Sequence, residues 1–262
     1  MSGLEVLSRR PAGGQPRTPL LFVHGAYVGA WCWDDHFLPW FAERGFPAYA
    51  VSLRGHGRSA GRERLHEFGL ADYVEDLAQV AGSLERPPVL IGHSMGALVV
   101  QKFLERTSVP AAVHICPVPP FGLLPASFAL AFGRPALFTE IHALASGHGA
   151  SRAALAEALF AGPVNGERIE RYYARMQAES RRALYDMSFW GLPQLWRMNR
   201  PETLVLGASH DSLIPAAMAQ SAATMLGAEY RLLDGLGHAV MLESAWERAA
   251  QEILDWLDAR GM

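Results

Sequence analysis

The stretch Val89-Leu90-Ile91-Gly92-His93-Ser94-Met95-Gly96-Ala97-Leu98-Val99-Val100 decides the fold and the candidate site of this 262-residue chain. Its short apolar run, Val89–Ile91, is typical of a buried strand, and the apolar residues after Gly96 continue as a helix. Between them lies the pattern G-x-S-x-G, in which a serine stands on a strained strand-to-helix turn. Glycines are needed because a Cβ atom on either side would clash with neighbouring backbone, and the helix N-terminus favours developing negative charge. The stretch therefore predicts Ser94 as a nucleophile.

Further short apolar runs alternate with helical patterns along the chain. This alternation predicts an α/β fold with a mostly parallel central sheet flanked by helices. Helices are expected at 73–84, 98–104 and 246–257, where apolar residues form core-facing stripes. Residues 4–8 are expected to form an antiparallel edge strand. Buried strands are expected at Leu20–Val23, Tyr49–Ser52, Val89–Ile91, Ala112–Cys116, Leu204–Leu206 and Tyr230–Leu233.

The interval 117–198 breaks this rhythm, because it has helical patterns but no clear strand. Residues 107–133 are expected to be a strand leading into an apolar loop, and later helices are expected at 152–160, 168–179 and 182–189. A structureless loop of the whole length would be uncommon in a compact domain. We therefore expect a core of residues 1–116 and 199–262, and a helical cap of residues 117–198 inserted after the fourth buried strand.

A serine hydroxyl needs a base to take its proton and a carboxylate to orient that base. His238 is the best candidate base because it follows the sixth strand, at the sheet edge where Ser94 also lies. The other nine histidines lie in less suitable segments. Asp211, after the fifth strand, is expected to be the acid. Its rival Asp234 ends its own strand next to Gly235, so a role in a turn is favoured there.

Acyl transfer also requires two N–H groups directed at the developing oxyanion. The backbone amide of Met95 is one expected donor, because this residue follows the nucleophile. The second should come from the loop after the first buried strand, where we choose Ala26, with Tyr27 as the alternative. His24 would then hold that loop.

Composition and charge exclude several classes of protein. The formal net charge is −3, which disfavours a nucleic-acid partner, and half of the residues are hydrophobic, which disfavours extended disorder. Cys32 and Cys116 are too few for a disulfide framework. The uncharged stretch 107–133 contains five prolines (Pro110, Pro117, Pro119, Pro120 and Pro125), so no membrane helix is expected there. Without a signal-peptide pattern, the chain is expected to be soluble and cytoplasmic.

Five motifs in this order resemble the α/β-hydrolase superfamily, and they extend over nearly the whole chain: His24-Gly25, Gly55-His56-Gly57-Arg58-Ser59, Gly92 to Gly96, Asp211 to Pro215, and Gly237-His238. The resemblance implies an α/β-hydrolase fold, and the order Ser94, Asp211, His238 is the one expected for its catalytic triad. The segments 24–33 and 238–242 look like the branch of plant methyl-ester esterases and hydroxynitrile lyases. The chain departs from that branch at Ala97, where a second glycine is usual.

The resemblance implies a serine hydrolase that cleaves carboxylic esters of a small-molecule substrate. Thioesters, lactones, lysophospholipids and carbon–carbon bonds next to ketones stay open as alternatives on the same triad. A non-enzymatic alternative is a receptor of this fold for small hydrophobic ligands. Enzymes that use an aspartate nucleophile are disfavoured by Ser94. No metal or organic cofactor is expected, because the sequence has no phosphate-binding glycine loop and no cluster of metal ligands.

An apolar substrate pocket is expected under the cap, because large apolar residues are frequent between Pro117 and Met198. Two to four of nine such residues should face Ser94, and short to medium acyl chains should suit the space that they leave. The expected substrate-binding residues are Tyr27, Phe121, Phe128 and Trp190. The sequence gives no prediction of the oligomeric state.

Overall fold

A seven-stranded sheet forms the centre of the computed structural model, which describes residues 3–145 and 149–262. Its strand order is β1-β3-β2-β4-β5-β6-β7. Only β1 among these strands pairs antiparallel, with β3, and the other pairs are parallel. The α/β fold with a mostly parallel sheet and an antiparallel edge strand is therefore confirmed. The strands are β1 Glu5–Arg9, β2 Leu20–Val23, β3 Ala48–Ser52, β4 Val89–His93, β5 Ala111–Ile115, β6 Glu202–Ala208 and β7 Glu229–Leu233.

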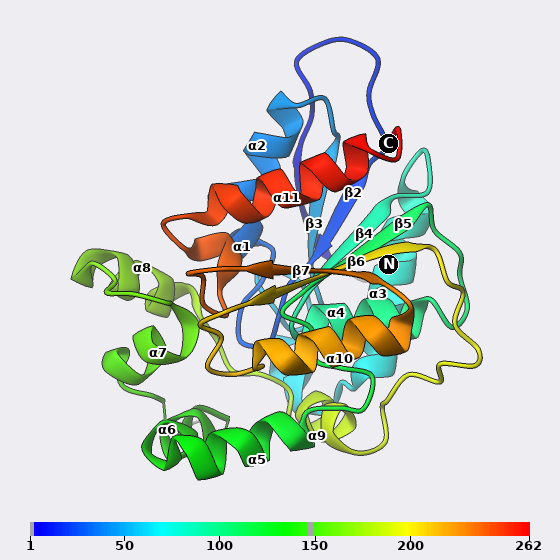
Figure 1. Cartoon of the computed structure of the whole chain (residues 1–262). Coiled ribbons are helices and arrows are strands. Elements are labelled where there is room, and N and C mark those ends of the chain that lie inside the picture. The colour runs from blue at the N-terminus through cyan, green and yellow to red at the C-terminus, as the bar shows by residue number, and fades with distance from the viewer. Residues whose placement is uncertain (1–2, 146–148) are drawn as a thin grey trace.

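Helices cover both faces of the sheet, so its central strands are continuous apolar runs rather than alternating ones. Leu20 and Phe22 of β2 face one apolar cluster, and Leu21 and Val23 face the other. Figure 1 shows α1 Trp31–Asp34, α2 Phe37–Glu43 and α11 Trp246–Asp258 on the first face. On the second face lie α3 Leu70–Ser83, α4 Met95–Phe103 and α10 Ala216–Leu226. This arrangement places β4 and the turn after it at the centre of the molecule.

The described residues between β5 and β6 form helices and their connections, and we call residues 117–198 the cap. Its helices in the described residues are α5 Leu124–Gly133, α6 Pro135–Ala145, α7 Arg152–Leu159, α8 Gly166–Arg175 and α9 Arg181–Ser188. They gather at the lower left and bottom of Figure 1. The expectation of an apolar loop up to residue 133 was wrong, because α5 begins at Leu124. Pro125 does not prevent this helix, since it occupies the first turn, where no N–H partner is needed.

Two short 3₁₀ helices complete the structure, η1 Arg62–Glu67 and η2 Val240–Leu242. In the described part of the chain, every helix is too short or too polar to cross a bilayer. The carboxyl ends of β2, β4, β6 and β7 lead into the loops that carry Ala26, Ser94, Asp211 and His238. Because parallel strands end at the same edge of a sheet, these residues come together there.

Candidate active site

Ser94 lies on a strained turn between β4 and α4. Its backbone has φ 52° and ψ −115°, a conformation that residues other than glycine rarely adopt. Glycine is required on both sides. A Cβ atom on Gly96 would lie 2.4 Å from the carbonyl oxygen of Val23, and one on Gly92 would lie 2.6 Å from the Cα atom of Ala97. The tight backbone packing lifts Ser94 to the wall of a cavity.

His238 and Asp211 form a buried hydrogen-bonded pair, with 2.8 Å between His238 Nδ1 and Asp211 Oδ2. The other carboxylate oxygen, Asp211 Oδ1, accepts hydrogen bonds from the backbone amides of Leu213 and Ile214, each at 2.8 Å. These bonds fix the carboxylate, which in turn fixes the imidazole. Nδ1 is occupied by Asp211, which leaves Nε2 for chemistry. Both His238 and Ser94 line the same cavity.

Asp234 has a different environment from Asp211. Its carboxylate accepts a hydrogen bond from Ser209 Oγ at 3.0 Å, and its backbone carbonyl accepts one from Arg248. The next residue, Gly235, has a positive φ of 70°. Asp234 therefore belongs to an exposed turn, and the carboxylate that is hydrogen-bonded to His238 is that of Asp211.

The buried thiol of Cys116 is a neighbour of this pair that the sequence analysis missed. Its sulfur lies within 4.8 Å of ligand atoms of Asp211 and His238, so these three groups could in principle share a metal ion. Burial, the charge of Asp211 and a hydrogen bond to Asp211 raise the pKa of the Cys116 thiol well above its usual range. Cys116 is therefore a buried, protonated thiol beside the carboxylate of Asp211.

The loop after β2 contributes Ala26, Tyr27 and Val28 to the lining of the same cavity. Ala26 and Met95 both line it beside Ser94. The amide of Tyr27, the alternative donor, is already directed at Glu179 Oε2, at 3.3 Å. Met95 is the first residue of α4, so its N–H has no partner in the preceding turn of the helix. This geometry favours Ala26 over Tyr27 in the predicted pair of donors.

His24 holds this loop through both of its ring nitrogens. His24 Nε2 accepts a hydrogen bond from the amide of Leu53 at 3.1 Å, so the proton of the neutral ring is on Nδ1. Nδ1 then donates to the carbonyl oxygen of Gly25 at 2.7 Å. Burial lowers the pKa of His24 to about 3, which keeps the ring neutral. The predicted role of His24 in holding the loop agrees with these bonds.

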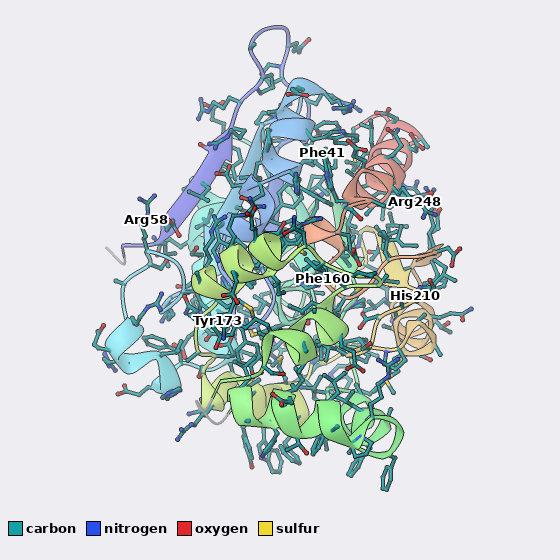
Figure 2. The ribbon with its side chains drawn as sticks, turned by 90° about the vertical axis from the view of Figure 1, so that its left-hand side faces the viewer. Phe41, Arg58, Phe160, Tyr173, His210 and Arg248 are labelled. Atoms are coloured by element: carbon teal, nitrogen blue, oxygen red, sulfur yellow. The ribbon has the colours of Figure 1, made fainter. Side chains whose placement is uncertain are left out.

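An apolar cavity of about 170 Å³ lies between the core and the cap. Core residues that line it include Tyr27, Trp31 and Met241, and cap residues include Leu130, Phe160 and Tyr172. Figure 2 shows Phe160 near the centre of the face that the cap covers. Phe160 and Met187 line this cavity. They belong to the nine large apolar cap residues counted from the sequence, which are Phe121, Phe128, Phe132, Phe138, Phe160, Met187, Phe189, Trp190 and Trp196.

Three of the predicted substrate-binding residues need correction. Phe121, Phe128 and Trp190 are not among the lining residues, whereas Tyr27 is. Phe128 is 59% exposed and Trp190 is 79% exposed. Phe121 precedes α5 and Trp190 follows α9. For Phe128, the prediction failed because it took the residues up to 133 as a loop beside the catalytic edge of the sheet. In the helix that forms instead, the 3.6-residue period turns Leu123, Ala126, Ser127 and Leu130 toward the cavity and Phe128 toward solvent.

A mostly parallel sheet with a serine on the turn after its central strand, and a buried His–Asp pair beside it, defines an α/β hydrolase. The chain matches the alpha/beta hydrolase family over residues 20–252 and belongs to that family.

The sequence matches to individual relatives cover less of the chain than the family match does. The chain is 33% identical over 117 residues to a non-heme chloroperoxidase from Burkholderia pyrrocinia, over 42% of this chain and 41% of that protein. It is 34% identical over 99 residues to methylesterase 2 from Arabidopsis thaliana, over 36% of this chain and 37% of that protein. Each match thus spans less than half of the relative. The structure of a thermophilic esterase from Thermogutta terrifontis, solved with malate bound, has a TM-score of 0.72, 19% identity, and coverage of 98% and 93% of the two chains. At this identity the likeness shows the fold alone.

Proposed function

We propose that this protein hydrolyses carboxylic esters of small to medium apolar groups through an acyl-enzyme on Ser94. The observation that supports the proposal most directly is the buried Asp211–His238 pair, whose histidine lines the same cavity as Ser94. The family membership and the similarity to a methylesterase agree with ester hydrolysis.

The proposed reaction has two steps. Ser94 Oγ attacks the ester carbonyl carbon while His238 Nε2 accepts the hydroxyl proton, and the amides of Ala26 and Met95 stabilise the oxyanion. The tetrahedral intermediate expels the alcohol, which takes the proton from His238. A water molecule then attacks the acyl group, again with His238 as the base, and the carboxylic acid leaves. Asp211 holds the imidazole and stabilises its charged form.

The cavity supports a small substrate. Its volume is about 170 Å³, and an apolar cavity of about 150 Å³ is enough to bind benzene. One buried methylene group contributes about 0.8 kcal/mol. We therefore expect kcat/KM to rise by an order of magnitude or more over the first few acyl carbons, and then to fall once the cavity is full.

A rate survey tests the proposal. Aryl esters from acetate to octanoate should be hydrolysed with an optimum at short to medium chains. Ser94→Ala should abolish turnover and labelling by a fluorophosphonate probe, while circular dichroism stays unchanged. Labelling of another serine in Ser94→Ala would refute the nucleophile, and equal rates at every chain length would refute the pocket.

The same survey separates the alternatives. It should include a thioester, a lactone, a lysophospholipid and a ketone with a cleavable carbon–carbon bond. Faster turnover of any of these would replace the ester proposal. A halogenation assay with bromide and hydrogen peroxide covers the activity named for the chloroperoxidase relative. A receptor would bind a small ligand tightly but turn over every ester slowly.

A further inference from the structure

The cap contacts the loop that carries Ala26 through both backbone polar groups of the next residue, Tyr27. The amide of Tyr27 donates to Glu179 Oε2 at 3.3 Å, and its carbonyl oxygen accepts from the amide of Gln177 at 2.9 Å. Glu179 and Gln177 lie in the cap segment 176–180, between α8 and α9. Tyr27 has φ 67°, which a residue with a side chain adopts only when its surroundings impose it.

Glu179 is a carboxylate with no contact to solvent, since its side chain is 0% exposed. Besides Tyr27, it accepts hydrogen bonds from Tyr73 OH at 2.9 Å and from the amide of Ser180 at 2.7 Å. His56 Nε2 lies 3.0 Å from Glu179 Oε2. Isolated charges are rarely buried in this way, so the carboxylate is held by a full set of partners.

The ionic state of this cluster follows from its contacts. Burial by itself would raise the pKa of Glu179, but His56 and the hydrogen-bond donors outweigh it, and the pKa of Glu179 is lower than usual. Burial would lower the pKa of His56, but Glu179 outweighs it and raises that pKa. His56 Nδ1 lies 3.1 Å from the carbonyl oxygen of Arg54, so both ring nitrogens of His56 face acceptors, which favours an imidazolium beside the Glu179 carboxylate. An ionised carboxylate is the stronger acceptor for the amide of Tyr27.

These bonds fix successive peptide planes around the predicted oxyanion donor. The carbonyl of Gly25 and the N–H of Ala26 belong to one planar peptide group, which His24 holds from the core. The next plane contains the N–H of Tyr27, which Glu179 holds from the cap, and the plane after it contains the carbonyl that Gln177 holds. The direction of the Ala26 N–H thus depends on one contact from the core and two from the cap.

We propose that Glu179 is a positioning residue for catalysis, which aligns the Ala26 amide through Tyr27 so that the oxyanion is stabilised only when the cap segment 176–180 is seated. The inference rests on the proposed ester hydrolysis. It gives the cap a role in the chemical step in addition to that of covering the substrate.

The test compares Glu179→Met with Glu179→Gln. Methionine keeps the length of the side chain but removes both carboxylate oxygens, so kcat on an aryl butyrate should fall about 10- to 100-fold while KM stays within about twofold. Glutamine keeps the size and polarity of the side chain, but the amide of Ser180 and Tyr73 OH would retain its single oxygen. Its NH₂ group would then face the amide of Tyr27, so kcat should fall about as far as in Glu179→Met. A short-chain trifluoromethyl ketone, which forms an oxyanion on serine, should lose affinity in parallel with kcat/KM.

Asp186→Asn is the matched control. Asp186 also joins the cap to the core, through the amide of Leu70 at 3.1 Å, but it does not contact the loop of Ala26. This variant should lower the melting temperature without changing kcat or the inhibitor affinity. If Glu179→Met does not fold, Glu179→Asp replaces it, because it keeps a charge beside His56 but is one methylene too short to reach Tyr27.

Each outcome decides the proposal. Folded Glu179→Met or Glu179→Asp with wild-type kcat, or with a raised KM alone, overturns the role of Glu179 and leaves ester hydrolysis standing. An equal loss of kcat in Asp186→Asn would also overturn it, because cap attachment in general would then be responsible. Absence of ester turnover in the wild type, together with no labelling of Ser94, would reject the proposed function itself.

Discussion

His93 Nε2 donates a hydrogen bond to the backbone carbonyl of His238 at 2.9 Å. His93, the residue before Ser94, therefore holds the loop that carries His238. The two ring centroids lie 4.7 Å apart. Burial, with a smaller effect of the neighbouring His238, lowers the pKa of His93 well below its usual range. His93 is therefore neutral, and its single ring proton is on the nitrogen that faces the carbonyl.

This contact predicts a measurable effect of His93 on turnover. His93→Leu should lower kcat/KM about tenfold, because it leaves the carbonyl of His238 unpaired and lets its loop shift. His93→Gln can place an amide N–H near the same carbonyl and should recover most of the activity. Steady-state kinetics on an aryl ester check this, with circular dichroism as the control for folding. Equal activity of the two variants would argue against the contact.

The surroundings of Asp211 predict a specific failure of Asp211→Asn. The amides of Leu213 and Ile214 would retain the oxygen of the asparagine, so its NH₂ group would face His238 Nδ1 and stabilise the wrong tautomer. We expect a loss of about 10³–10⁴ in kcat. Asp234→Asn should lower kcat less than about tenfold, because Asp234 only stabilises a turn. The reverse ranking of kcat values would reassign the acid.

The cavity wall predicts how chain-length preference can be changed. Ala126 on α5 is 2% exposed and lines the cavity, whereas Ala129 on the same helix is exposed. Ala126→Leu should move the optimum to shorter acyl chains and lower kcat/KM for butyrate about tenfold relative to acetate, since added carbons fill the space. Ala129→Leu adds the same carbons outside and should keep the wild-type profile. An unchanged optimum in both variants would place the acyl group elsewhere.

His114 on β5 predicts a loss of stability in acid. It is fully buried, neither ring nitrogen has a hydrogen-bond partner in the described residues, and burial lowers its pKa to about 4. In the unfolded chain a histidine has a pKa of about 6.5, so between these values the unfolded state binds a proton that the folded state does not. The contribution of His114 to the free energy of unfolding therefore falls as pH falls through this window.

His114→Leu removes this titration and gives the measurement. In denaturant unfolding at pH 7, 6 and 5, the free energy of unfolding of the variant should rise relative to that of the wild type. The rise should be up to about 1.4 kcal/mol for each pH unit below pH 6.5. At pH 7 and above, the difference between the two proteins should be constant. Parallel curves throughout would mean that His114 is protonated or solvated in the folded protein.

The strands and the serine turn could be predicted because each has a local signal. The parallel strands are short apolar runs, and Ser94 lies in a glycine pattern that only a tight strand-to-helix turn requires. The helix α5 could not be predicted in this way, because its proline and its weak amphipathic pattern resemble those of a loop. That one error also misplaced Phe128, since the side chains that face the cavity depend on helical period and not on size.

The sequence by itself determined the α/β fold and the positions of Ser94, Asp211 and His238 after β4, β6 and β7, and it favoured Asp211 over Asp234. Each of these follows from residues within a few positions of one another. Only the tertiary structure decided which cap residues line the cavity, and that Glu179 contacts Tyr27 across 152 residues of chain. Such contacts depend on the directions of side chains that distant segments bring together, and no local period or spacing records those directions.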